Sequence, residues 1–351
     1  MTEPTHSQVA HRTVGDDEAE QRLDRWFRRH WPHVSQGRIE KMCRKGEIRV
    51  DGARAKASTR VAPGQSVRIP PLPVGEGPAP ENSRDGAPEI PPPAELLDAI
   101  VFRDDHMIVL NKPAGLAVQG GSKQTRHLGA MLAGLRFGRG DDPRLVHRLD
   151  RDTSGLLVLA RTGAAASALG RMFKSKVVDK IYIAAVAGKP EPDAGTIRYG
   201  LVKAGGRGAE KMEIVHPNQV AETPGAKTAI TDYRVIDQLG TRLAAVAMRP
   251  VTGRTHQLRA HMAALGSPIA GDGKYAGRGQ ENLGDGWGAG LGGGLSRKLH
   301  LHAVQLHLPH PITGKRLSFF APLPDHMART WATVGWDPAD LREELLERPV
   351  D

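Results

Sequence analysis

Apolar positions follow strand-like patterns over much of the chain after residue 99. The run from Leu156 to Ala160 is continuously apolar, opens at Gly155 and is too short for a helix of ordinary length, so it predicts a buried strand. Further strands are predicted at 100–102, 107–110, 180–186, 228–235 and 242–248. A helical spacing of apolar residues predicts one helix at 255–264, stopped by Gly266. Several strands with few helices favour an α+β domain built on a largely antiparallel sheet.

The segment near the N-terminus has a different pattern. Leu23, Trp26 and Phe27 recur at helical spacing, which predicts an amphipathic helix over 21–30. A second helix is predicted over 35–45, where Ser35 is a candidate cap and Gly46 a stop signal. Short apolar alternation at 48–50 and 66–69, with a turn dipeptide at 51–52, predicts a small strand pair.

These patterns divide the chain into five parts. Residues 1–18 are polar without periodicity and predict a mobile tail, and the helices and short strands predict a small domain over 19–70. Residues 71–95 are rich in Pro and Gly, as in a semi-extended linker. A larger domain is expected over 96–325, with a C-terminal tail over 326–351 and a flexible glycine-rich loop at 277–294.

Composition and charge narrow the class of protein. No apolar run approaches the length of a membrane span and the N-terminus is too polar for a secretory signal, so we expect a cytoplasmic protein with no membrane partner. A single cysteine excludes an intramolecular disulfide. The net charge is +10, and residues 22–68 alone hold 13 Lys and Arg against 4 Asp and Glu. Such local excess positive charge favours a nucleic-acid partner.

A dense group of charges lies directly before the predicted buried strand. His147, Arg148, Asp150, Arg151 and Asp152 fall within six residues. A buried carboxylate without a partner costs several kcal/mol, so Asp150 needs a neighbouring cation if it is structural. A surface turn of solvated charges and a reactive carboxylate are both compatible with this pattern alone.

Four motifs in order resemble the RluA-type pseudouridine synthases, which isomerise uridine in RNA. His-Arg-Leu-Asp-Arg-Asp-Thr-Ser-Gly at 147–155 is similar to the catalytic motif of that family. Similar matches follow the family order at 109–115, at 180–188, and at 253–261 leading to 271–275, and together they span most of residues 97–324. In the N-terminal segment, residues 38–50 resemble the helix–turn–strand core of S4-type RNA-binding modules.

The resemblance implies a set of site residues. It makes Asp150 the nucleophile or base, Arg259 its ion-pair partner, and Tyr182 the aromatic side chain that stacks on the target base. Arg148 is implied to fill the space that the extruded base leaves, and the resemblance places Leu258 in the pocket floor. His147 and Arg254 complete the expected substrate-binding set, and Asp152 is interpreted as a local charge partner. Contacts with RNA phosphates are expected from Arg38, Lys41, Arg44 and Lys45.

The resemblance also implies a fold and an activity. It implies a long, bent and cleft sheet, and isomerisation of uridines in large-subunit ribosomal RNA by a protein that we expect to be a monomer. Breaking and remaking one bond from ribose to base needs no redox step, so we expect no cofactor and no metal. The histidines at 256, 261, 300, 302, 307 and 310 are therefore interpreted as core or RNA-facing side chains.

Three alternatives remain open at this point. Residues 118–122 are most similar to one subgroup of synthases that act on large-subunit ribosomal RNA, although Gln119 stands where that subgroup has histidine. A related synthase that acts at another site of the same RNA is the first alternative. A non-catalytic ribosome-assembly factor is the second. A glycoside-type hydrolase using Asp150 and Asp152 as paired carboxylates is the third, but such enzymes draw the two acids from separate elements.

Overall fold

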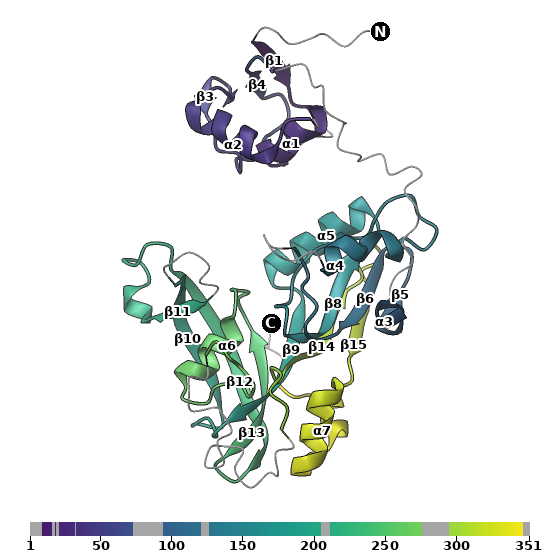
Figure 1. The fold of residues 1–351 in the computed structure, drawn as a ribbon, viewed down its shortest axis with the longest axis vertical. Helices are drawn as coiled ribbons and strands as arrows, with labels where there is room; N and C mark the ends of the chain where they lie inside the picture. The colour runs from purple at the N-terminus through teal and green to yellow at the C-terminus, as the bar shows by residue number, and fades with distance from the viewer. Residues whose placement is uncertain are drawn as a thin grey trace. The chain divides into compact units, whose positions relative to one another are not determined.

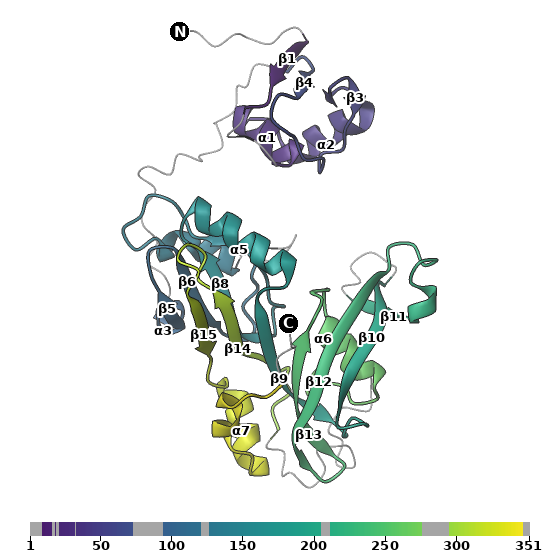
Figure 2. The same ribbon diagram turned by 180° about the vertical axis from the view of Figure 1, so that it is seen from behind.

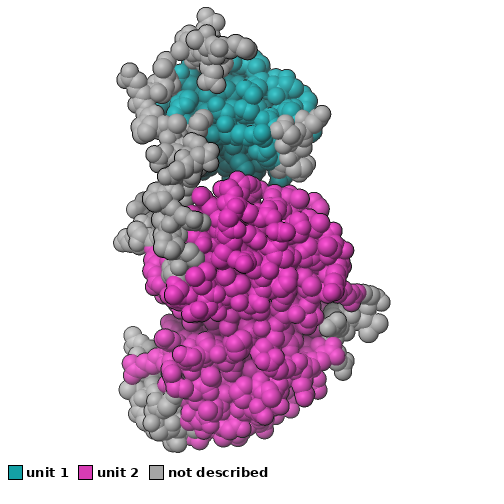
Figure 3. Space-filling view, turned by 90° about the vertical axis from the view of Figure 1, so that its right-hand side faces the viewer, with its two compact units in different colours: residues 1–88 teal, residues 89–351 magenta. Residues whose placement is uncertain are grey.

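The computed structural model describes residues 9–15, 18, 21–31, 33–72, 94–120, 126–204, 211–275 and 295–346 of the 351-residue chain. The chain divides into two compact units, residues 1–88 and 89–351, which Figure 3 shows in two colours. Most of the predicted linker and the glycine-rich loop at 277–294 lie outside the described residues. No helix in the described ranges is long and apolar enough to cross a membrane.

The first unit packs two helices on a small antiparallel sheet (Figure 1). Helices α1 (Leu23–His30) and α2 (Gln36–Lys45) form where the apolar spacing predicts them. The sheet has the order β1-β4-β2-β3, with β1 at Ala10–Thr13, β2 at Arg49–Val50, β3 at Ala53–Arg54 and β4 at Ser66–Ile69. The side chains of Leu23, Trp26 and Phe27 are fully buried in its core, so the predicted amphipathic face of α1 is confirmed.

Two details of this unit differ from expectation. The expected mobile tail contains β1, which pairs residue by residue with β4 from Ala10↔Ile69 to Thr13↔Ser66. This pairing satisfies the backbone edge of β4, and Val14 is buried directly after it. Ser35 occupies the N-cap of α2 as predicted, but its side chain makes no capping hydrogen bond.

The second unit is built on one eleven-stranded sheet. The strand order is β11-β10-β12-β13-β9-β14-β8-β6-β5, with β15 paired to β14 and β7 paired to β8. Every pairing is antiparallel except the one between β8 and β14, which confirms the predicted class. The strands are β5 (Ile100–Arg103), β6 (Met107–Lys112), β7 (Arg144–Leu145), β8 (Ser154–Ala160), β9 (Asp179–Ala187), β10 (Ala194–Lys203), β11 (Met212–Val215), β12 (Lys227–Leu239), β13 (Leu243–Pro250), β14 (Leu301–Pro309) and β15 (Arg316–Phe320).

Helices cover both faces of this sheet (Figures 1 and 2). On β9, Tyr182 packs into the same core as α4 (Leu128–Met131), the 3₁₀-helix Leu132–Leu135 and α6 (Gln257–Ala264). Its neighbours Ile181 and Ile183 pack on the other face with α7 (Asp325–Val334). The remaining helices are α3 (Ala94–Asp98), α5 (Gly163–Ser175), and the 3₁₀-helices Pro217–Gln219 and Pro338–Arg342. β9 is therefore buried on both faces, as a central strand is.

The expected C-terminal tail over 326–351 is wrong for the part that the structure describes. Helix α7 and the segment after it bury Trp331, Trp336, Leu341 and Leu346 in the core on the second face of the sheet. These residues cover apolar side chains of β9 and β13 that would otherwise face water. Residues 326–346 are thus an integral part of the second unit.

Gly155 fixes where the charged segment enters the sheet. Its φ is +109°, and a Cβ at this position would lie 2.3 Å from the carbonyl oxygen of Ala303. Only glycine permits the chain to approach β14 this closely in that conformation. The loop before β8 is therefore held at a defined point beside β14 and β9.

Candidate active site

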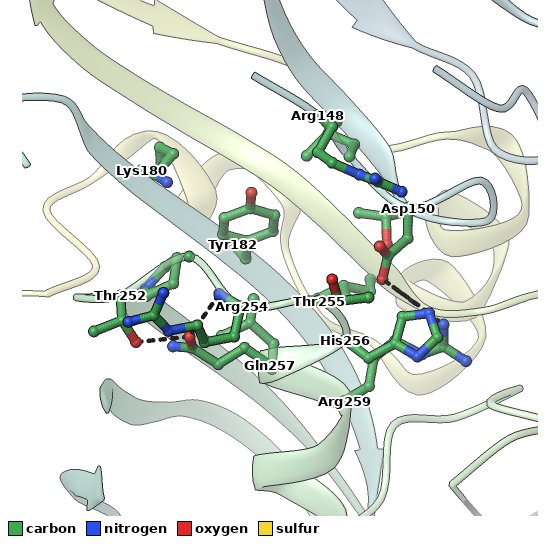
Figure 4. A pocket seen from close by; sticks show the side chains of 16 residues that line it. Arg148, Asp150, Lys180, Tyr182, Thr252, Arg254, Thr255, His256, Gln257 and Arg259 are labelled. Atoms are coloured by element: carbon green, nitrogen blue, oxygen red, sulfur yellow. Dashed lines mark hydrogen bonds and ion pairs between the residues drawn. The ribbon is translucent and has the colours of Figure 1, made fainter. Parts of the chain in front are cut away.

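A pocket of about 140 Å³ opens beside the start of β8 (Figure 4). Three segments distant in sequence supply its walls: the loop before β8, the face of β9, and the loop that runs from the end of β13 into α6. The lining residues are Arg148, Leu149, Asp150, Thr153, Lys180, Tyr182, Pro250, Thr252, Gly253, Arg254, Thr255, His256, Gln257, Leu258, Arg259 and Leu301. All the expected site residues of this unit except His147 line it.

Asp150 lies in the loop before β8 and turns its carboxylate into the pocket, with 21% of the side chain exposed. Lys112 binds this loop, because its buried ammonium donates to the carbonyl oxygen of Arg151 at 3.1 Å. The same ammonium donates to the carbonyl oxygens of Pro113 and Leu116 at 2.8 and 2.9 Å. Burial lowers the pKa of Lys112 to about 7, against the opposing charges of Asp152 and Asp150. Lys112 thus joins the 109–115 motif to the loop that carries Asp150.

Arg259 reaches Asp150 less directly than expected. Its Nη1 lies 3.8 Å from Asp150 Oδ2, which is beyond hydrogen-bond distance. Its Nε and Nη2 instead donate to the two carboxylate oxygens of Asp272 at 2.7 and 2.6 Å. Arg259 therefore forms the expected ion pair with Asp150, at 3.8 Å, and its hydrogen-bonded partner is Asp272, to which the sequence analysis gave no role.

Asp272 is held as firmly as the arginine that it binds. Its side chain is fully buried, and Oδ1 also accepts the backbone N–H groups of Lys274 and Tyr275. Gly271 precedes it with φ +74°, at a point where a Cβ would meet the Lys298 carbonyl oxygen at 2.0 Å. The turn at 271–275 thus fixes Asp272, and through it the orientation of the Arg259 guanidinium.

His256 is a neighbour of Asp150 to which the sequence interpretation gave no role in the site. Its Nε2 lies 3.8 Å from Asp150 Oδ2, while Nδ1 is 3.1 Å from the hydroxyl of Tyr275. The residue is buried and adopts a left-handed backbone conformation, with φ +53°, at the N-cap of α6. Burial lowers the pKa of His256, and the charge of Asp150 opposes that shift. Strained conformations of this kind concentrate at functional sites.

The floor and one wall of the pocket are apolar. Tyr182 on β9 and Leu258 on α6 are 8% and 6% exposed and belong to the same core. Burial raises the pKa of the Tyr182 phenol, and the charge of Asp150 raises it further. Tyr182 is therefore a neutral aromatic surface at physiological pH, suited to the flat face of a base.

Two exposed arginines stand at the mouth. Arg148 precedes Asp150 by two residues and lines the pocket, and Arg254 does so from the β13–α6 loop. The Arg254 Nε donates to the carbonyl oxygen of Thr228 at 3.1 Å, which anchors its side chain to β12. Both guanidinium groups can meet an anionic ligand that enters from solvent.

His147 and Asp152 lie outside the pocket lining. The Val158 N–H donates to His147 Nε2 at 2.8 Å, the ring stacks on Phe173 at 4.2 Å, and burial lowers the pKa of His147 to about 3. His147 is therefore a neutral packing residue, and its expected substrate-binding role is corrected. Asp152 accepts from Arg151 at 3.0 Å, as expected of a local charge partner.

The other histidines of interest are buried or hydrogen-bonded. His302 bonds Ser154 Oγ at 2.9 Å and the Ala321 carbonyl oxygen, and His300 bonds Thr330 Oγ1 at 2.8 Å. His261 bonds Thr231 Oγ1 at 2.9 Å. Within the described ranges, no three His, Cys, Asp or Glu side chains come together as metal ligands would.

The basic face of the first unit is formed as expected. Arg38, Lys41, Arg44 and Lys45 are all exposed on α2, on the side opposite Ile39, Met42 and Cys43. Among these four cations, only Lys45 has an ion pair within the described residues, at 3.8 Å from Glu47. This surface carries positive charge that the unit does not neutralise.

Known proteins share both units. The family profile for RNA pseudouridylate synthases matches residues 106–264, and the S4 domain profile matches residues 21–67. Ribosomal large subunit pseudouridine synthase C of Rickettsia typhi is 35% identical over 312 residues, 88% of this chain and 95% of that protein. The protein of the same name from Vibrio cholerae is 36% identical over 92% of this chain and 95% of its own length. A solved structure, human RNA pseudouridylate synthase domain containing 4, matches 69% of this chain and 95% of that chain with a TM-score of 0.56 and 29% identity.

Proposed function

Because this chain belongs to the RNA pseudouridylate synthase family and carries an N-terminal S4 domain, we propose that it isomerises uridines to pseudouridine in large-subunit ribosomal RNA. One observation carries the proposal. Three of the four sequence motifs line one pocket, and Lys112 of the fourth binds the loop that carries Asp150. The pocket holds a single partly exposed carboxylate, Asp150, which faces a buried tyrosine and a fixed arginine.

This pocket suits an isomerisation that begins and ends with a bond to ribose. The bond from C1′ to N1 of uracil breaks, the freed base turns, and C1′ rejoins at C5. Asp150 acts as the nucleophile or base of these steps, and Arg259 and His256 keep its carboxylate oriented from 3.8 Å without occupying it by a hydrogen bond. The ring of Tyr182 and the side chain of Leu258 form the surfaces against which the base lies.

A uridine within folded RNA reaches Asp150 only after it leaves its stack, at a cost of a few kcal/mol. Arg148 is exposed at the mouth of the pocket, two residues from Asp150, and its guanidinium fills the vacated position in the RNA. Arg254 binds the RNA at the opposite side of the mouth. Arg38, Lys41, Arg44 and Lys45 supply sequence-independent affinity through phosphate contacts.

The two rival functions find less support. A paired-carboxylate hydrolase needs a second acid in the pocket, but Asp152 is bound by Arg151 and does not line it. A ribosome-assembly factor without catalysis has no need for the arrangement of Asp150, Arg259 and Asp272. We propose that the protein acts as a monomer in the cytoplasm, where ribosomal RNA is its partner.

The experiment compares pseudouridine maps of ribosomal RNA from cells with and without the gene. We expect specific pseudouridines of the large-subunit RNA to disappear on deletion, to return with the wild-type gene and to stay absent with Asp150→Asn. Loss of pseudouridine at positions other than those that ribosomal large subunit pseudouridine synthase C modifies would place the enzyme in a different subgroup. An unchanged map would refute the proposed activity.

A further inference from the structure

Lys180 is a pocket residue that the proposed mechanism does not yet use. It precedes Tyr182 by two residues on β9, so the two side chains project from the same face of the strand. Both line the pocket, and Figure 4 shows the Lys180 ammonium on the far side of the Tyr182 ring from Asp150. A cation therefore stands at one end of the aromatic surface and the reactive carboxylate at the other.

The charge of Lys180 lacks a partner among the residues that the structure describes. Within the described residues, no carboxylate forms an ion pair with its ammonium, and Nζ lies 5.8 Å from the centre of the Phe173 ring. Burial lowers the pKa of Lys180, a shift that the charge of Asp179 only partly opposes. Among the other cations that line the pocket, Arg259 is bound by Asp272, and Arg148 and Arg254 are exposed to solvent, which screens their charge. Lys180 is the partly buried pocket cation for which the described residues provide no ion pair.

An uncompensated, partly buried ammonium lowers the stability of the folded protein unless a ligand supplies negative charge. Residues that lower the stability of the folded protein in this way are commonly functional. Lys180 is therefore expected to bind a negative charge that enters the pocket at the end opposite Asp150.

The reaction itself generates such a charge on the base. When the bond between C1′ and N1 breaks, its electron pair stays with uracil, and the electron-deficient C1′ is compensated by the negative carboxylate of Asp150. The charge of the resulting uracil anion spreads over its two carbonyl oxygens. After the base turns, C5 donates an electron pair to form the new bond to C1′, and the proton of C5 leaves while N1 gains one. The base is thus neutral before the bond between C1′ and N1 breaks, negatively charged until the bond between C1′ and C5 forms, and neutral at the end.

We propose that Lys180 contacts a carbonyl oxygen of the extruded uracil and stabilises the negative charge that the base carries between cleavage and rejoining. This role rests on the proposed function. With C1′ at Asp150 and the base against Tyr182, the carbonyl edge of uracil extends toward Lys180. Because the base is charged only after cleavage has begun, the contact strengthens in the transition state and accelerates the reaction rather than tightening binding.

An RNA phosphate is the competing ligand for this ammonium. The exposed Arg148 and Arg254 stand at the mouth of the pocket, where an RNA backbone has access from solvent, whereas Lys180 is partly buried beside the Tyr182 ring. The position of Lys180 therefore favours the base. The two ligands give different results, because a phosphate contact adds to affinity and to its salt dependence.

The test compares the wild type with Lys180→Met, Lys180→Arg and Lys174→Met, the last a lysine exposed on α5 outside the pocket lining. Pseudouridine formation is measured in a single turnover at saturating RNA, and the RNA Kd is measured over a salt series. We expect Lys180→Met to lower the rate constant by about 100-fold, as loss of one charge-stabilising donor does, with Kd and salt slope unchanged. Lys180→Arg should recover part of the rate, and Lys174→Met should retain the wild-type rate.

Thermal melting gives an independent readout. Methionine removes the unpaired charge but keeps much of the shape, so Lys180→Met should melt at a higher temperature than the wild type. A wild-type rate in Lys180→Met would overturn the proposal. A weaker Kd with a shallower salt slope and a normal rate would assign Lys180 to a phosphate instead, and a lower melting temperature would mean that its charge is compensated within the fold. A wild-type protein that forms no pseudouridine in the same assay would refute the proposed function itself.

Discussion

The pair between Arg259 and Asp272 gives a sharp prediction about how Asp150 is kept reactive. We expect Asp272→Asn to release the guanidinium, since asparagine keeps one acceptor oxygen but removes the charge that binds Nε and Nη2 at 2.7 and 2.6 Å. The freed guanidinium can then close the 3.8 Å gap to Asp150 and hydrogen-bond it directly. A carboxylate engaged in this way is a weaker nucleophile and base.

The size of the effect follows from burial. Arg259 and Asp272 have side chains 5% and 0% exposed, and removing one partner of a buried ion pair costs about 3–5 kcal/mol. We expect the lower end of this range, about 3 kcal/mol, because asparagine retains an acceptor and Asp150 partly compensates the arginine. A displacement of the catalytic geometry by about 1 Å lowers rates by roughly 100-fold, and we expect a loss of that order.

Stability is measured by denaturant unfolding, and the rate by single-turnover pseudouridine formation at saturating RNA. Leu341→Ala, which removes a fully buried side chain on the opposite face of the sheet, is the control for stability, with an expected cost of about 2–5 kcal/mol. It should keep the wild-type rate. If Asp272→Asn lost stability but turned over as fast as Leu341→Ala, the pair would be structural only and the argument would fail.

Three further predictions concern RNA and pH. Arg148→Ala should slow turnover on structured RNA more than on a short unstructured strand with the same uridine, since only the first requires unstacking; equal slowing would exclude the space-filling role. Replacing both Lys41 and Arg44 by Gln should weaken RNA binding and reduce the salt slope by slightly less than one unit per lost phosphate contact, and an unchanged slope would exclude α2 from the interface. Burial lowers the pKa of His300 and His302 to about 4 in the folded protein. Because these histidines have a pKa of about 6.5 in the unfolded chain, they are protonated there at a higher pH than in the folded protein. The free energy of unfolding should therefore fall as pH drops from about 6.5 to 4. His302→Asn should flatten this part of the pH profile in denaturant unfolding, and an equally steep profile would count against these buried rings as its source.

Local patterns in the sequence were sufficient to predict several elements. The apolar run at 156–160 forms part of β8, as predicted. Its continuous apolar pattern was informative because the side chains of this strand are buried on both faces of the sheet. Helix α5 was not predicted, although its sequence at 163–175 carries the signals of a helix. Thr162 caps its N-terminus, and Ala165, Leu169 and Met172 recur at helical spacing. These apolar residues pack against β8, so tertiary contacts add to the local signals.

The site was predictable where motifs carried it. The resemblance identified Asp150, Tyr182 and Arg259, and the structure brings them to one pocket. It did not identify Asp272 as the partner of Arg259, because that contact joins a helix to a turn 13 residues further on and depends on the fold between them. The left-handed conformation that aims His256 at Asp150 is likewise invisible in the sequence, although its position within the 253–261 motif was a signal.

The assignment of a single catalytic acid is the central claim, and the most direct measurement is single-turnover pseudouridine formation by Asp150→Asn and Asp152→Asn on the same RNA. We predict no product above background from Asp150→Asn, with RNA affinity unchanged. Asp152 is 42% exposed and paired with Arg151, and an exposed pair contributes about 0–1 kcal/mol, so Asp152→Asn should retain most of the rate. Equal loss of activity in the two variants, or product from Asp150→Asn, would contradict the account.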